Sequence, residues 1–437
     1  MEYSAAALKP YLKDRRWVGQ NNRYVKSTVQ RLSDDVRSGQ TLSGLQQKHL
    51  RELIAASVIT HCLDGWALLG RAASSTLLGD PHSARHLAYY AELRGAVSLL
   101  ASAGISVFNN QHLVVASTGQ IAISRNTWFV GGRAGTHVAA WLFLQEWATT
   151  PDAAATTSSV LLPEGHPLSS WFNGSPAWAT WRSNSSGWLK SLGLDVRLMA
   201  RDQFARHEAS YRPTTIRSDR QYATAIENSR FVTDLWRIAE PGGRPFAALD
   251  SGLLRLAVER SYRGYAGSQS DLTSPAYSAD IARLVGNLGF PTARQNHLVR
   301  YLLRTDSPDD HGAFVAAAEH SKAISPAHHF HAMARAILML RVATGAARRM
   351  LDNAGIEADQ LAFWWQQLAS SRSICVAHEP EDLLDTWADV ADAIEELDTF
   401  AANEPNATFV ELGHGSRPSA IATLGRFELA GLIGLVA

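Results

Sequence analysis

The feature that most constrains this chain is the recurrence of apolar residues once per helical turn over most of its length. Residues 48–72 carry them at the three- and four-residue spacing of an amphipathic helix. A second helix is expected over 80–104, where a capping Asp80 precedes Pro81. The segment 326–351 is apolar around most of its circumference, which predicts a buried central helix. These patterns predict a mainly α fold.

The apolar period changes in two places. Residues 113–115 and 121–123 are short β-prone runs separated by a polar turn, which predicts a β-hairpin within 113–130. The apolar stretches 408–412 and 427–436 near the end of the chain predict a further strand pair.

The length of 437 residues predicts two domains. Small and polar residues between 150 and 165 predict a domain boundary or a long exposed connection. We therefore expect an N-terminal helical domain over 1–150, which contains the small β-hairpin, and a C-terminal helical-bundle domain over 165–437.

The composition argues against several functions and locations. The formal net charge is +0, so the whole chain exerts no electrostatic pull on nucleic acid or on an anionic membrane. Only two cysteines occur, and neither belongs to a Cys-x-x-Cys motif. The first residues lack the apolar region of a secretion signal, and no apolar run reaches ~18 residues. We expect a cytoplasmic bacterial protein without a cofactor, a metal or a membrane contact.

Charge is divided unevenly along the chain. Residues 352–411 contain fourteen acidic residues and a single basic residue, Arg372. Residues 1–60 contain ten basic and five acidic residues. This asymmetry predicts complementary docking, either within the chain or onto a protein partner.

One short motif suggests chemistry. Arg201 is followed by Asp202 and, with five residues between, by His207. This pattern resembles the Arg-polar-…-His motif of HEPN-type domains, which are small helical bundles and often metal-independent ribonucleases. The resemblance implies that His207 activates or protonates oxygens at the cleaved bond. It also implies that Arg201 holds the phosphate and that Asp202 is the polar residue after the arginine.

The same spacing occurs at Arg304 and His311 and at Arg372 and His378. Arginine and histidine are frequent enough that such matches are expected by chance. The pair on the predicted helix is preferred because only it has the polar residue after the arginine.

Other candidate features have structural interpretations. His328 and His331 have the spacing of metal ligands on a helix, but no carboxylate or thiol nearby completes a site. Residues 131–136 lack the lysine of a phosphate-binding loop and are interpreted as a hairpin-to-helix turn. The tryptophans between Trp171 and Trp236 are interpreted as packing residues.

Three functions remain open from the sequence. The first is a non-enzymatic helical scaffold or accessory subunit of a bacterial protein complex, which requires a protein partner. The second is a HEPN-like metal-independent endoribonuclease of the toxin or phage-defence type, with RNA as its substrate. The third is a nucleic-acid-binding regulator that uses the arginines of 197–263. The sequence determines neither the partner nor the oligomeric state.

Overall fold

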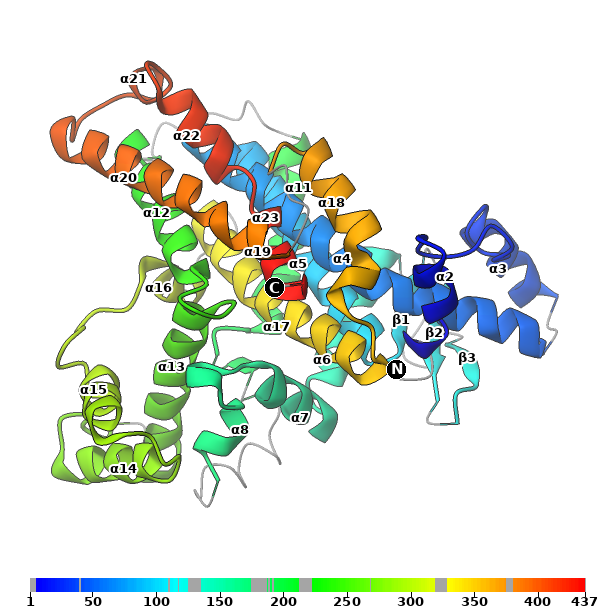
Figure 1. Ribbon diagram of the computed structural model, residues 1–437, viewed down its shortest axis with the longest axis horizontal. Coiled ribbons are helices and arrows are strands. Elements are labelled where there is room, and N and C mark those ends of the chain that lie inside the picture. Colours follow the sequence, from blue (N-terminus) through cyan, green and yellow to red (C-terminus); the bar gives the residue numbers. More distant parts are fainter. Residues whose placement is uncertain are drawn as a thin grey trace.

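A computed structural model describes most of the chain (Figure 1). The described residues are 5–38, 41–108, 111–116, 118–124, 135–173, 187, 189–190, 192–211, 222–267, 269–318, 328–374 and 380–436. Helices dominate this part of the chain, and its only sheet has three short antiparallel strands. The prediction of a mainly α fold with a small hairpin is therefore confirmed.

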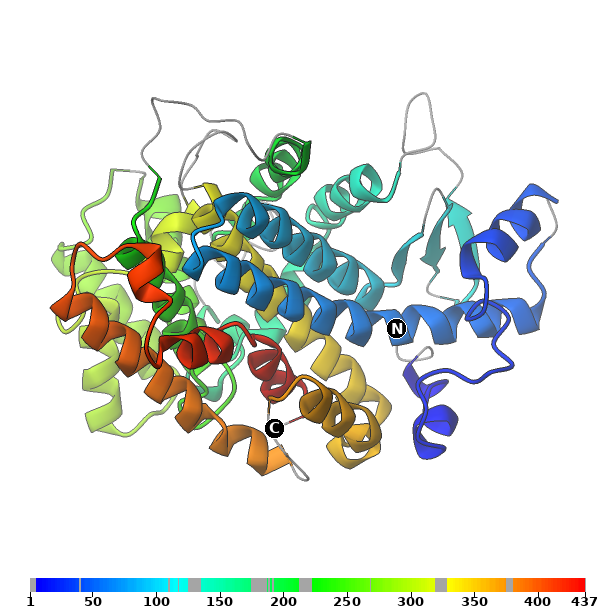
Figure 2. The same cartoon turned by 90° about the horizontal axis from the view of Figure 1, so that it is seen from above.

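Three long helices form the centre of the molecule. They are α4 (Gly44–Leu77), α5 (Pro81–Ser102) and α17 (His328–Ala354). The first two form an antiparallel pair, seen from above in Figure 2, and α17 packs against both. Glycines permit this close packing, since a Cβ on Gly65 of α4 would lie 2.4 Å from Leu340 Cδ2 of α17. The predicted buried central helix is confirmed.

The small sheet follows α5. Its strands are β1 (Ile105–Phe108), β2 (Gln111–Val115) and β3 (Ile121–Ser124), in the order β1-β2-β3. Strands β2 and β3 form the predicted hairpin, with Leu113 opposite Ile123. Residues 125–130 of that prediction lie outside the described residues.

The expected exposed connection after residue 150 is wrong. Thr150 caps a helix, α7 (Pro151–Val160), by accepting a hydrogen bond from Ala153 N. The small residues that suggested a linker are buried instead, because α7 packs closely against α17. One hydrophobic core therefore runs through both halves of the chain. The division into domains 1–150 and 165–437 stays a prediction about folding units.

The expected C-terminal strand pair is also wrong. Thr408 and Glu411 form a capping box that starts α21 (Phe409–Leu412). The last apolar stretch is α23 (Glu428–Val436), which is buried on nearly all sides. Its Gly431 lies against Trp66, so a helix here fills the core between α4 and α17.

The remaining helices cover this centre. Helices α14 and α15 form the lower left part of Figure 1, and α20 to α22 form its upper left part. Two short 3₁₀ helices span Pro163–Gly165 and Ala358–Leu361. The other α-helices are α2 (Lys9–Lys13), α3 (Thr28–Arg37), α6 (Thr136–Trp147), α8 (Leu168–Trp171), α11 (Val196–Tyr211), α12 (Ala225–Ala239), α13 (Ala247–Ala266), α14 (Pro275–Gly286), α15 (Thr292–Leu302), α16 (Gly312–Ala318), α18 (Ala362–Ser371), α19 (Pro380–Asp385), α20 (Trp387–Asn403) and α22 (Arg417–Leu424).

One helix of the described chain, α4, is long and apolar enough to cross a membrane, and the bent pair α22 and α23 passes the same test together. In α4, 61% of the most apolar stretch is buried against the rest of the protein. Core helices of globular proteins share this property.

A buried ion pair joins the central helix to the C-terminal half. Arg341 of α17 binds both carboxylate oxygens of Asp250 of α13 at 2.7 Å, and it also donates to Val160 O at the end of α7. Asp250 accepts a further hydrogen bond from Leu162 N. Both side chains are at most 5% exposed. This pair therefore fixes α7 and α13 on α17.

We expect Arg341→Met to lower the free energy of unfolding by about 3–5 kcal/mol, because it leaves the buried charge of Asp250 without its partner. Arg349→Met, an exposed position on the same helix, is the matched control and should change stability by less than about 0.5 kcal/mol. Urea denaturation of both variants measures the difference. Equal stability would show that the ion pair does not hold these helices together.

Candidate functional site

The three residues of the predicted motif lie on α11 but do not share one face. Arg201 and His207 are exposed, whereas Asp202 is buried. Six positions on an α-helix correspond to a separation of about 120° around its axis. The structure therefore does not direct Arg201 and His207 toward a common point, and their catalytic roles stay a prediction.

Asp202 points into a buried cluster of charged groups. It accepts two hydrogen bonds from Arg335 of α17, at 3.1 Å from Nε and 2.6 Å from Nη2. Glu92 of α5 lies 3.4 Å from the same Nε. Burial and the nearby charge of Asp202 raise the pKa of Glu92 well above its usual value, so the surroundings favour its neutral form.

Arg206 lies one helical turn beyond Asp202 on the same face of α11. Its guanidinium carbon is 5.6 Å from the ring centres of both Tyr89 and Tyr90 on α5. Among the described residues, its Nε has no hydrogen-bond partner, although that atom is buried. Arg206 also forms no ion pair with another described residue. A cation of this kind, held by aromatic rings, retains hydrogen-bond donors for an anion.

Two histidines flank Tyr90. The ring of His86, from the first turns of α5, is centred 4.9 Å from it, and that of His137, from the start of α6, is centred 5.5 Å from it. His86 Nδ1 is hydrogen-bonded to Ser210 Oγ at 2.7 Å, and His137 Nδ1 to the Tyr89 hydroxyl at 3.0 Å. We name His86, Tyr89, Tyr90, His137 and Arg206 the His–Tyr–Arg cluster.

Electrostatics keep both histidines neutral near pH 7. Burial, followed by the charge of Arg206, lowers the pKa of His86 and that of His137 below the usual 6.5. His207 and Arg94 lower the pKa of His137 further. His207 thus lies close enough to act on the cluster, although it is not packed within it. A neutral imidazole is available as a general base, although its lowered pKa makes it a weaker one, and the neighbouring Arg206 can bind an anion.

The sequence analysis identifies none of the five residues of this cluster as functional. The available signal was the four-residue spacing of His86 and Tyr90 and of Asp202 and Arg206, which places each pair on one helix face. The approach of α6 and α11 to α5 has no local sequence signal.

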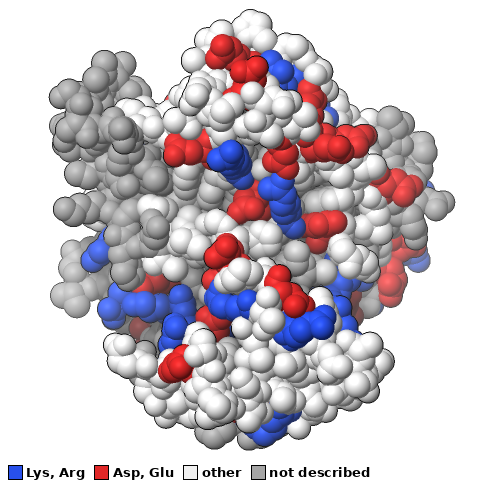
Figure 3. Space-filling model, turned by 90° about the vertical axis from the view of Figure 1, so that its left-hand side faces the viewer, with Lys and Arg blue, Asp and Glu red and all other residues white. Residues whose placement is uncertain are grey.

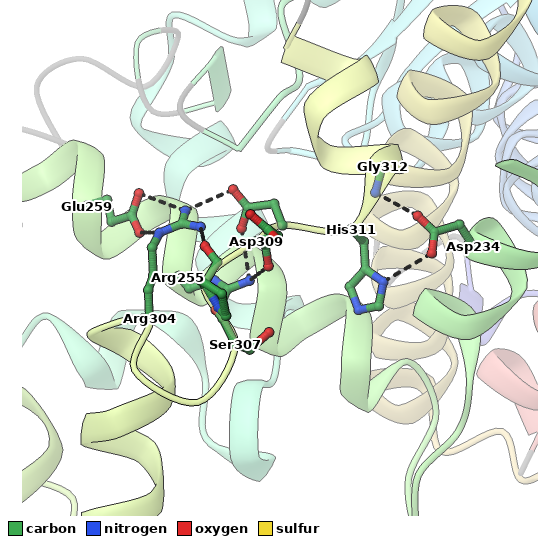
Figure 4. Close-up of polar contacts among 10 residues, drawn as sticks. Asp234, Arg255, Glu259, Arg304, Ser307, Asp309, His311 and Gly312 are labelled. Atoms are coloured by element: carbon green, nitrogen blue, oxygen red, sulfur yellow. Dashed lines mark hydrogen bonds and ion pairs between the residues drawn. The ribbon is translucent and has the colours of Figure 1, made fainter. Parts of the chain in front are cut away.

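The second arginine–histidine match has a structural role (Figure 4). Arg304 binds Glu259 of α13 and Asp310, whereas His311 points away toward Asp234 of α12. Asp234 also accepts a hydrogen bond from Gly312 N at 2.6 Å, and its pKa is lowered by His311 and by that bond despite its burial. Arg304 and His311 therefore anchor the loop before α16. His378 of the third match lies outside the described residues.

The remaining candidates gain no support as sites. Among the described residues, no group of three or more His, Cys, Asp or Glu side chains is arranged to hold a metal ion. Trp171 and Trp236 are fully buried, in agreement with a packing role. Most of the predicted turn over 131–136, and the tryptophans Trp178, Trp181 and Trp188, lie outside the described part of the chain.

The buried cluster makes a prediction about stability. Glu92→Gln places an amide that cannot ionise where burial disfavours a charged carboxylate, so we expect stability at pH 7 to be unchanged or higher. Because the raised pKa of Glu92 costs stability as pH rises above its usual value of 4.5, this variant should also lose that part of the pH dependence.

Asp202→Asn leaves Glu92 able to ionise and neutralise Arg335. The double variant Glu92→Gln/Asp202→Asn has no carboxylate left to neutralise Arg335. We expect its free energy of unfolding to fall by about 3–5 kcal/mol, which exceeds the sum of the two single changes. Denaturation of the four proteins at pH 5 and pH 7 measures this coupling. Additive effects would contradict the shared network.

In comparisons with known proteins, no protein-family model, no curated protein and no solved structure matches this chain.

Proposed function

We propose that this protein is a metal-independent ribonuclease whose reaction takes place at the His–Tyr–Arg cluster. One observation carries the proposal: two histidines kept neutral by their surroundings flank Tyr90 beside Arg206, whose Nε has no partner among the described residues. The HEPN-like motif of α11 is not the support for this site, because Arg201 and His207 take no part in the proposed reaction. The arginine that would act is Arg206, because Arg201 lies elsewhere around the helix.

The reaction follows from the groups present. One histidine accepts the proton of a ribose 2′-hydroxyl, whose oxygen attacks the adjacent phosphorus. The P–O5′ bond breaks, and the leaving oxygen takes a proton from a second, protonated histidine. The products are a 2′,3′-cyclic phosphate and a free 5′-hydroxyl. Arg206 binds the non-bridging oxygens and stabilises their charge in the transition state. DNA, which has no 2′-hydroxyl, is not a substrate.

Arg206→Ala and His137→Gln should each lower the rate of cleavage of a single-stranded RNA by about 10²-fold or more. The matched control is Arg201→Ala, an exposed arginine on the same helix, which should cleave at the wild-type rate. The assay measures fragments with cyclic phosphate ends, and thermal unfolding confirms that each variant is folded. Loss of activity in Arg201→Ala alone would favour the original motif and overturn the role of Arg206.

The histidine pKa values provide a test independent of turnover. Arg206→Gln removes a positive charge that lowers the pKa of His86 and of His137, so both values should rise toward 6.5. Cleavage requires one protonated histidine, so the wild-type optimum should lie below pH ~6.5 and move upward in any residual activity of this variant. NMR titration of the imidazole signals measures the shift. Unchanged values would show that Arg206 does not act on these rings.

A second candidate is a scaffold or accessory subunit that binds another protein. The observation that favours it is the exposure of the acidic residues of α20, several of which form no ion pair with the described residues. A third outcome, RNA binding without cleavage, would instead indicate a nucleic-acid-binding regulator. That outcome requires an affinity that falls steeply with salt concentration.

A further inference from the structure

A surface groove lies between α12 and α20. It has a volume of about 340 Å³ and is lined by both apolar and acidic residues. The apolar residues of the lining are Trp387, Ala391 and Ile394, and the acidic ones are Glu240, Glu395 and Asp398. Arg237 is the single basic residue of the lining, and it is already paired with Asp398. The groove therefore presents apolar surface together with uncompensated negative charge.

The acidic surface continues along α20 beyond the groove. Asp385 at the end of α19 and Asp389, Asp392 and Glu395 of α20 are all exposed. None of the four forms an ion pair with another described residue. Asp389 and Asp392 are three residues apart, as are Asp392 and Glu395, so successive acids are neighbours on the helix, and the first and third are about 120° apart around its axis. In Figure 3, acidic side chains gather on the upper part of this face of the molecule, where α20 and α21 lie.

The complementary charge lies at the other end of the molecule. Lys26, Arg31 and Arg37, in and just before α3, are exposed and form no ion pair within the described part of the chain. Two acids lie among them: Asp34 is hydrogen-bonded to Gln30, and Asp35 is paired with Arg23. Figures 1 and 2 both place α3 and α20 at opposite ends of the long axis. The two charged surfaces therefore cannot meet within one chain.

We infer that the α12–α20 groove of one molecule binds the α3 surface of a second copy in a head-to-tail arrangement. Arg31 and Arg37 are six residues apart on their helix, as are Asp389 and Glu395 on theirs, so the members of both pairs are separated by about 9 Å along the axis and about 120° around it. The exposed side chain of Val25, beside the basic residues, provides an apolar group for the apolar lining of the groove. Each copy carries both surfaces, so the contact is heterologous and builds rings or open chains.

This inference does not depend on ribonuclease activity. The contact is rich in exposed charge, so its strength should fall with ionic strength. Sedimentation velocity of the full chain over a range of concentrations should show association at 20 mM NaCl that is at least tenfold weaker at 500 mM NaCl. A protein that stays monomeric at every concentration in low salt would overturn the inference.

Charge reversal tests the two surfaces separately. Asp389→Lys/Asp392→Lys and Arg31→Glu/Arg37→Glu should each abolish self-association. An equimolar mixture should associate again with the two variants alternating, because the native surfaces of unlike variants are complementary and so are their reversed surfaces. The variant with all four changes should associate again, because its reversed surfaces are complementary.

The matched control is Glu146→Lys/Asp309→Lys, two exposed acids outside both surfaces, which should associate as the wild type does. Circular dichroism confirms that every variant is folded. Failure of the mixture to associate, or an effect of the control equal to that of the α20 variant, would show that these surfaces do not meet.

Discussion

Two buried arginines of α17 hold the surrounding helices in place. Arg335 binds Asp202 of α11 beside Glu92 of α5, and Arg341 binds Asp250 of α13 while donating to the end of α7. A buried charge without its partner is strongly destabilising, so each pair specifies one arrangement of its helices. Apolar packing alone permits several arrangements of helices this rich in alanine, whereas the ion pairs permit one.

The position of the candidate site follows from the first of these pairs. Asp202 and Arg206 are one turn apart, so the bond that fixes Asp202 on α17 also fixes the height and rotation of α11 over α5. That rotation places Arg206 over the two tyrosines and brings its charge near the histidines. Burial is the main cause of the lowered pKa values of His86 and His137, and the charge of Arg206, whose position depends on this ion pair, lowers them further.

The two proposals concern separate parts of the molecule. The His–Tyr–Arg cluster depends on α5, α6 and α11, whereas the acidic groove depends on α12 and α20. A self-associating ribonuclease and a self-associating scaffold are both consistent with this separation. The His–Tyr–Arg cluster favours the ribonuclease over the scaffold, because a scaffold has no requirement for two neutral histidines beside an arginine.

Local sequence predicted the helical segments and the hairpin, because hydrophobic period and capping residues act over a few positions. It identified Asp80-Pro81 as a helix start and 326–351 as a buried helix, and the structure agrees. It failed at α7 and α23, where small or β-prone residues become helical because the surrounding core buries them. The capacity of the chain for helices is thus a property of its sequence alone.

The site was decided by tertiary structure. The sequence identified Asp202 but not its partner, which lies 133 positions away, and it grouped Arg201 with His207 although the helix turns them apart. Likewise, composition reveals opposite charges in 1–60 and 352–411, but only the fold shows which parts of them are apart: α3 and α20 lie at opposite ends of the molecule, whereas Trp17 packs on Trp364. Helical periodicity specifies which face of each helix is buried, whereas the choice of partner for that face depends on contacts between residues far apart in the chain.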